Sequence, residues 1–74
     1  MVEKTDWEMK AANLLKAELK RKGVTYAQLV DLLSQLGVDE KEVNVRNKLS
    51  RGKFTAAFFL QCLSAAGVHS LQLD

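Results

Sequence analysis

The 74-residue sequence contains no proline, one cysteine and one histidine. A single cysteine excludes an intramolecular disulfide, and one cysteine with one histidine cannot by themselves complete a four-ligand zinc site. The longest apolar run, residues 56–60, is too short to span a membrane. No apolar segment follows the first charged residues, so we expect no secretory signal. A reduced, cytoplasmic protein with no membrane association, metal or cofactor is therefore the expectation.

Residue sets that carry catalysis are also missing. No Ser/His/Asp set, glycine-rich phosphate loop or pair of carboxylates in a cleft can be assembled from the sequence. Cys62 lies beside Phe58 and Leu63 in an apolar segment, which favours a buried, inert thiol over a nucleophile. His69 follows the last glycine and is expected at the surface or in a cap. We therefore expect no catalytic residues, no enzyme activity and no small-molecule substrate.

Acidic residues are absent from most of the second half of the chain. The formal net charge is only +2, yet residues 43–73 contain no Asp or Glu. The same stretch contains four cations: Arg46, Lys48, Arg51 and Lys53. Concentrated positive charge of this kind predicts an anionic partner.

Glycine is scarce, and its spacing divides the chain into helix-sized segments. Each of four glycines follows a segment with helical periodicity, as left-handed caps do: Gly23, Gly37, Gly52 and Gly67. Capping boxes predict helix starts at Thr5, Thr25 and Asp39. A weaker start is predicted at Thr55. The predicted helices cover about 6–22, 26–36, 40–51 and 55–66.

The four predicted helices differ in how much apolar surface they carry. Trp7 and Tyr26 begin the apolar faces of the first two, where core packing is expected rather than base stacking. The third is mostly polar, with Val45 and Leu49 as its apolar pair. The fourth is apolar nearly all round, which is typical of a core helix or an oligomer interface. Residues 68–73 alternate and predict a short extended tail.

The third helix is predicted to present an outward face suited to DNA. With Val45 directed inward, the side chains placed outward as candidates for base contacts are Asn44, Asn47, Ser50 and Arg51. The candidates for phosphate contacts are Arg46, Lys48 and Lys53. Arginine pairs with guanine and asparagine with adenine, while cations on phosphates fix the register. A merely solvated polar face is the structural alternative.

Two acids in the predicted first turn of this helix oppose DNA binding. Glu40 and Glu42 complement the helix dipole but repel phosphate. Either these acids point away from DNA, as the helical wheel indicates for Glu42, or Glu40 accepts a hydrogen bond from cytosine N4.

Several motifs follow one another in a familiar order: Thr25, Leu29-Val30, Gly37-Val38-Asp39, Arg51-Gly52-Lys53 and Gly67. In these motifs the chain resembles the lambda-repressor-like, XRE-type helix–turn–helix family. Tyr26 stands where that family usually has a phosphate-contacting glutamine, and Val30 stands where it has a small alanine. The resemblance implies a helical bundle that binds double-stranded DNA.

A second set of motifs extends over most of the chain: Leu15-Lys16-Ala17-Glu18-Leu19-Lys20, Tyr26, Asn47 to Phe54, and Phe58 to Leu63. Through these motifs, between Trp7 and Gly67, the chain more closely resembles a small bacterial family of uncharacterised domains. That resemblance implies no biochemical activity.

We therefore expect residues 1–74 to form one all-α, four-to-five-helix, lambda-repressor-like domain, with its core at 6–67 and tails at 1–5 and 68–74. The predicted function is sequence-specific binding of double-stranded DNA by a bacterial transcription regulator, acting as a homodimer. Two alternatives stay open. One is a protein-interaction or oligomerisation module that uses the Phe58/Phe59 helix and the Leu71/Leu73 tail, and the other is RNA binding.

Overall fold

Four helices form the regular structure of residues 5–73, the part of the chain that a computed structural model describes. They are α1 (Thr5–Lys22), α2 (Tyr26–Gln35), α3 (Glu42–Arg51) and α4 (Ala56–Ala65). No strand occurs in this range, and the chain after α4 has no regular secondary structure. The predicted all-helical class is confirmed.

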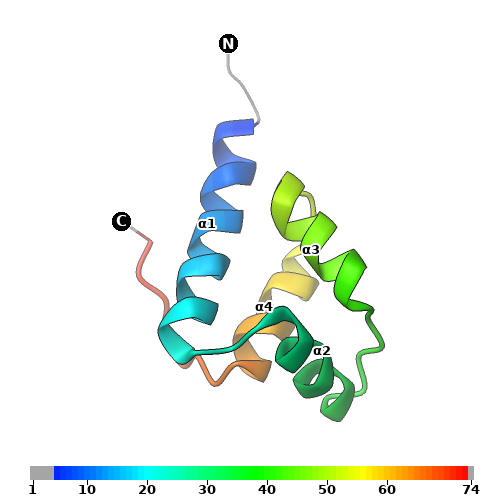
Figure 1. Cartoon of the computed structure of the whole chain (residues 1–74). Helices are drawn as coiled ribbons and strands as arrows, with labels where there is room; N and C mark the ends of the chain where they lie inside the picture. Colours follow the sequence, from blue (N-terminus) through cyan, green and yellow to red (C-terminus); the bar gives the residue numbers. More distant parts are fainter. Residues whose placement is uncertain (1–4, 74) are drawn as a thin grey trace.

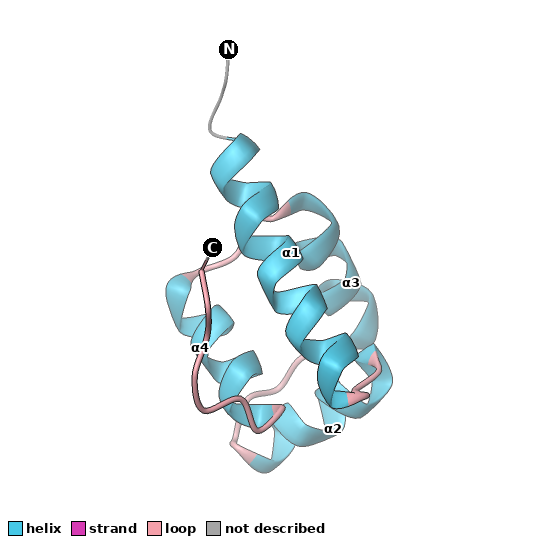
Figure 2. Ribbon diagram, turned by 90° about the vertical axis from the view of Figure 1, so that its left-hand side faces the viewer, coloured by secondary structure: helices cyan, strands magenta, loops and turns pink. Residues whose placement is uncertain are grey.

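Contacts between helices join α1 and α2 to the other two helices. α1 packs against α3 and α4, and α2 packs against the same two helices (Figure 1). α2 lies across the base of the molecule as Figure 1 shows it, below α1 and α3. The C-terminal segment and α3 lie on opposite sides of α1 (Figures 1 and 2). The tail therefore leaves α3 uncovered.

The core forms where the apolar stripes of the four helices meet. Six large side chains are fully buried: Leu15, Leu29, Leu33, Val45, Leu49 and Cys62. Each buried leucine contributes about 1.5–3 kcal/mol relative to an exposed one. α3 supplies only Val45 and Leu49 to this core, as its sequence pattern predicts, so most of its surface faces solvent.

Most of the predicted helix ends are confirmed. All four glycines have positive φ, and Gly52 is the left-handed cap of α3, with φ 69°. Thr25 forms the predicted capping box with Gln28: its hydroxyl accepts from the Gln28 N–H at 3.1 Å, and its own N–H donates to Gln28 Oε1 at 2.9 Å. The Thr55 hydroxyl likewise accepts from the Phe58 N–H at 2.9 Å.

The start of α3 was predicted wrongly. The helix begins at Glu42, and its N-cap residue is Lys41, which makes no side-chain capping bond. Glu40 lies outside the helix and accepts a hydrogen bond from Lys48 Nζ at 2.6 Å. The capping box expected between Asp39 and Glu42 therefore does not form, because Glu42 is the first residue of the helix rather than its third. The side chain of Thr5, the other predicted cap, lies outside the described residues.

Trp7 and the C-terminal tail also depart from expectation. Trp7 is 74% exposed rather than part of the core, and it borders a hollow that Leu14 and Leu73 also line. Its ring is accompanied by Lys10, whose Nζ lies 5.8 Å from the ring centroid. Val68 and Leu71 of the tail pack against the core, so the core continues beyond its predicted end at residue 67.

Candidate nucleic-acid interface

The predicted base-reading residues lie on the outward surface of α3. Two buried side chains, Val45 and Leu49, hold this helix against its neighbours. All four candidates for base contacts are exposed: Asn44, Asn47, Ser50 and Arg51. Val43 adds an exposed apolar side chain to the same helix. The structure therefore brings two amides, a hydroxyl, a guanidinium and a methyl-bearing side chain to one accessible helix.

The three predicted phosphate-binding cations, in contrast, make ion pairs within the chain. Arg46 Nη2 lies 2.8 Å from Glu42 Oε2, one helical turn earlier. Lys53 Nζ lies 3.3 Å from Glu8 Oε2 in α1, 45 residues earlier in the sequence. The third pair joins Lys48 and Glu40. The partners of these cations are therefore three glutamates that precede the acid-free stretch in the sequence: Glu8, Glu40 and Glu42.

Lys48 is the most deeply placed of the three cations. Its Nζ lies 2.6 Å from Glu40 Oε2 and 4.4 Å from the centroid of the Phe58 ring. The Lys48 side chain is 35% exposed and that of Glu40 only 15%. This arrangement holds the Glu40 carboxylate against the protein and away from the outward face of α3. The interpretation of Glu40 as a reader of cytosine is therefore not favoured.

The same ion pair lies close to the buried thiol. Burial raises the pKa of Cys62 to about 12, the Glu40 carboxylate adds to the rise, and the Lys48 ammonium opposes it. The thiol is fully buried. It is consequently protonated and shielded at neutral pH, as the sequence predicted.

Arg51 differs from the other cations of this segment. It is exposed and makes no ion pair with the side chains that the structure describes. It also lies in the last turn of α3, where a cation complements the negative end of the helix dipole. Arg51 is therefore the cation of α3 that is open to an external anion.

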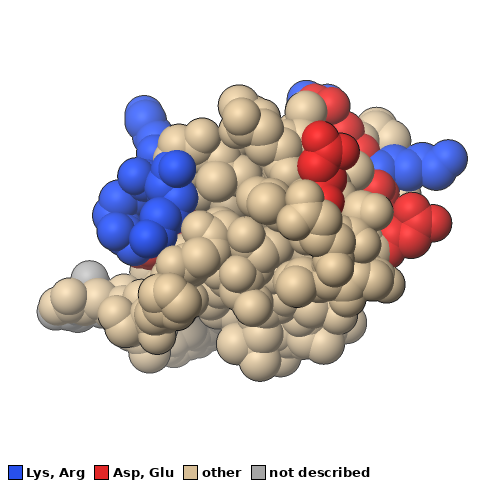
Figure 3. Space-filling model, turned by 90° about the horizontal axis from the view of Figure 1, so that it is seen from below, with Lys and Arg blue, Asp and Glu red and all other residues tan. Residues whose placement is uncertain are grey.

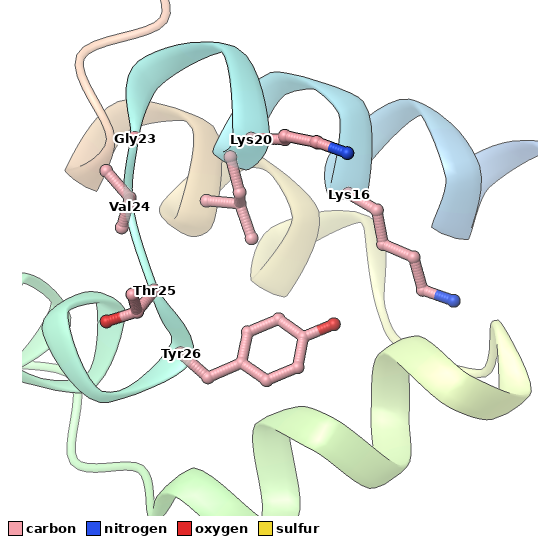
Figure 4. Close-up of a pocket in the computed structure, with 7 residues that line it drawn as sticks. Lys16, Lys20, Gly23, Val24, Thr25 and Tyr26 are labelled. Atoms are coloured by element: carbon pink, nitrogen blue, oxygen red, sulfur yellow. The ribbon is translucent and has the colours of Figure 1, made fainter.

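Tyr26, whose ring contacts Arg46 of α3, is one wall of a hollow. The Arg46 guanidinium carbon lies 5.7 Å from the centroid of the Tyr26 ring, and the hollow, of about 470 Å³, lies between α1 and the start of α2 (Figure 4). Lys16 and Lys20 line it from α1. Neither lysine makes an ion pair within the described part of the chain.

The sequence had not singled out Lys16 and Lys20. The available signal was their spacing, because two cations at i and i+4 share a helix face and repel each other unless an anion lies between them. Glu8 was missed for another reason. No local pattern connects it with Lys53, since the contact depends on how α1 crosses the end of α3.

Among the side chains that the structure describes, no group of three or more His, Cys, Asp or Glu residues could hold a metal ion. None of the helices in that range is long and apolar enough to cross a membrane.

Comparison with known families gives one match. The family described as "Domain of unknown function (DUF6471)" matches residues 7–71. The chain belongs to this family. The DUF6471 match takes in α2, α3 and α4 completely and α1 from Trp7 onward, so it includes both the outward face of α3 and the hollow. It confirms the resemblance to a family of uncharacterised domains. No curated protein and no solved structure was found to match the chain.

Proposed function

We propose that this DUF6471 domain binds double-stranded DNA through the outward face of α3 and acts as a transcription regulator with a lambda-repressor-like fold. The supporting observation is the joint exposure of Asn44, Asn47, Ser50 and Arg51 on a helix that two buried residues anchor. The ten residues of α3 make a rod about 15 Å long, and the major groove admits a helix.

The chemistry of this face matches the edges of bases in the major groove. A guanidinium such as that of Arg51 pairs with guanine O6 and N7, and the amides of Asn44 and Asn47 pair with adenine N6 and N7. The exposed Val43 suits the methyl group of thymine. The Glu40 and Glu42 carboxylates are each bound by a cation of α3, which weakens their repulsion of phosphate.

The proposal includes a homodimer that reads two half-sites. α2 packs against α3, and the chain between them turns at Gly37, with φ 83°. Helix–turn–helix dimers place their two reading helices about 34 Å apart, one turn of DNA. A selected binding site with two related halves at that spacing would be the expected signature.

Selection of bound oligonucleotides from a random duplex pool tests the proposal. We expect one enriched sequence. Arg51→Ala should bind that sequence more weakly by about 1–3 kcal/mol and should show a weaker preference at one base position. Lys22→Ala is the control, since Lys22 is an exposed cation on another helix and makes no ion pair with the side chains that the structure describes. No enriched sequence, or equal binding by both variants, would reject the proposal.

A protein-interaction module is the second candidate, and exposed apolar side chains favour it. Leu60 on α4 is 62% exposed and Leu73 in the tail is 60% exposed. The face seen from below is also largely without charged side chains (Figure 3). Phe58 itself is buried and cannot serve such a surface in the folded monomer, which corrects the residues expected for this alternative. Light scattering with a gel shift on random duplex DNA separates the candidates.

RNA binding is distinguished by competition. The same cations would contact an A-form backbone, and the exposure of Trp7 makes one aromatic ring accessible for stacking. Duplex RNA that displaces duplex DNA from the protein at equal concentration would favour the RNA interpretation.

A further inference from the structure

We infer that the hollow between α1 and the start of α2 binds a phosphate group, held by the ammonium groups of Lys16 and Lys20 and the hydroxyl of Tyr26. Where that phosphate belongs to a DNA backbone, the inference rests on the proposed function. In that case the main contacts with the DNA phosphates come from α1 and α2 rather than from α3. Where it is free phosphate, the inference stands alone.

The hollow gathers groups from different parts of the chain. Lys16 and Lys20 come from successive turns of α1, while Thr25 and Tyr26 come from the start of α2 (Figure 4). In that view both lysine side chains extend to the same side as the Tyr26 hydroxyl, and the ring lies between α1 and α3. Leu19 and Val24 supply an apolar wall.

The charge of the hollow is positive and uncompensated by its own lining. No acidic residue lines it. Glu18, the acid nearest in sequence, pairs with Arg21, and Glu42 on α3 pairs with Arg46. Arg46, which lies against the Tyr26 ring, adds a further cation at the edge. Its exposed pair with Glu42 is weak enough for an anion to compete for the guanidinium.

Hydrogen-bond donors in the hollow are also available. Lys16, Lys20 and the Tyr26 hydroxyl make no hydrogen bond with any side chain or backbone group that the structure describes. An ammonium group offers three donors, and a phenol offers one. The start of α2 contributes the positive end of a ten-residue helix dipole beside them. These are the groups that phosphate oxygens accept from.

The i, i+4 spacing of Lys16 and Lys20 also favours a bound anion. Like charges at i and i+4 destabilise a helix, and no acid stands three or four residues from Lys16 or Lys20 to relieve their repulsion. Glu18, two residues from each lysine, pairs with Arg21 instead. A bound dianion or phosphodiester would remove that repulsion. The Tyr26 ring, which contacts Arg46, is the link between this hollow and α3.

The test compares Lys16→Gln/Lys20→Gln with Lys10→Gln/Lys22→Gln, which removes the same charge from the same helix outside the hollow. Tyr26→Phe keeps the ring and removes only the hydroxyl. Circular dichroism melting checks that each variant folds. In one arm, inorganic phosphate is titrated into labelled protein and backbone amide shifts are followed, with chloride at matched ionic strength as the control. In the other arm, binding of random duplex DNA is measured against salt concentration.

Saturable amide shifts around Tyr26 and Lys20 with phosphate but not chloride support the inference even when DNA does not bind. They should be lost in Lys16→Gln/Lys20→Gln, weakened in Tyr26→Phe and kept in Lys10→Gln/Lys22→Gln. Loss of about 1.8 from the slope of log K against log salt, with DNA binding at least about tenfold weaker at 0.1 M salt, supports it for the DNA backbone. If DNA binds through Arg51 but both double variants behave alike and phosphate causes no saturable shift, the hollow is rejected and the proposed function stands. If phosphate causes no saturable shift and DNA does not bind, both the inference and the proposed function are rejected.

Discussion

The backbone carbonyl of Glu8 in α1 occupies the position that a Cβ atom on Gly52 would require. Gly52 ends α3 in the left-handed conformation, and it is buried where the end of α3 meets the first turn of α1. The next residue, Lys53, pairs with the Glu8 side chain at 3.3 Å. The close approach of these two backbones therefore helps to set how α3 is presented.

Gly52→Ala is expected to destabilise the domain by more than about 2 kcal/mol. The new Cβ adds a backbone overlap to the strain of a left-handed alanine, which costs about 1–2 kcal/mol by itself. Gly37→Ala is the matched control, because Gly37 has φ 83° but no atom near its Cβ position. Urea denaturation measures both. Equal losses would show that the approach of α1 to α3 does not matter.

Glu40→Gln is expected to lower the free energy of unfolding by about 1–3 kcal/mol, because it leaves a half-buried Lys48 ammonium without its charged acceptor. Glu42→Gln removes a carboxylate from an exposed pair and should cost less than about 0.5 kcal/mol. Thermal melts at low and high salt compare the two. A larger loss for Glu42→Gln would contradict the structural role assigned to Glu40.

The Cys62 thiol should make stability fall at alkaline pH. Its pKa is raised from 9.0 to about 12 by burial, so above pH 9 the unfolded chain loses this proton while the folded chain keeps it. Unfolding is then favoured by up to about 1.4 kcal/mol for each pH unit between 9 and 12. Cys62→Ala lacks this thiol, and the difference between the two stability curves isolates it from lysine titration. Parallel curves would rule out the raised pKa.

Two side chains of α4 should differ sharply when truncated. Phe58→Ala is expected to cost about 3–5 kcal/mol because the ring is 4% exposed and packs in the core. Leu60→Ala should change the unfolding free energy by less than about 0.5 kcal/mol, since that side chain is 62% exposed. Denaturation at two protein concentrations provides the measurement. A large, concentration-dependent loss for Leu60→Ala would identify an oligomer surface instead.

Local sequence signals predicted the helices well because each signal acts within a few residues. The Thr25 capping box, the glycine caps and the Val45/Leu49 pair all involve neighbours in sequence, and the structure confirms each. Asp39 is not a cap because α3 begins later, at Glu42, with Lys41 as its N-cap residue. The exposure of Asn47 and Arg51 followed from the helical period alone.

Interactions between distant residues could not be predicted in the same way. The charge of the α3 segment looked unopposed because Glu8 lies 45 residues from Lys53 in the chain. The hollow depends on α1 meeting the start of α2 beside Tyr26, which no spacing in the sequence specifies. Trp7 has the apolar character of a core residue, but its exposure depends on how α4 and the tail meet the first turn of α1, which no local pattern specifies.

The position of Trp7 has a consequence for spectroscopy. It is the only tryptophan of the chain, and its indole is 74% exposed in the folded state. Intrinsic fluorescence of the native protein will accordingly resemble that of an indole in water and shift little in wavelength on denaturation. A quencher such as iodide reaches this ring without unfolding, so emission intensity will report events at the free end of α1 rather than loss of the core.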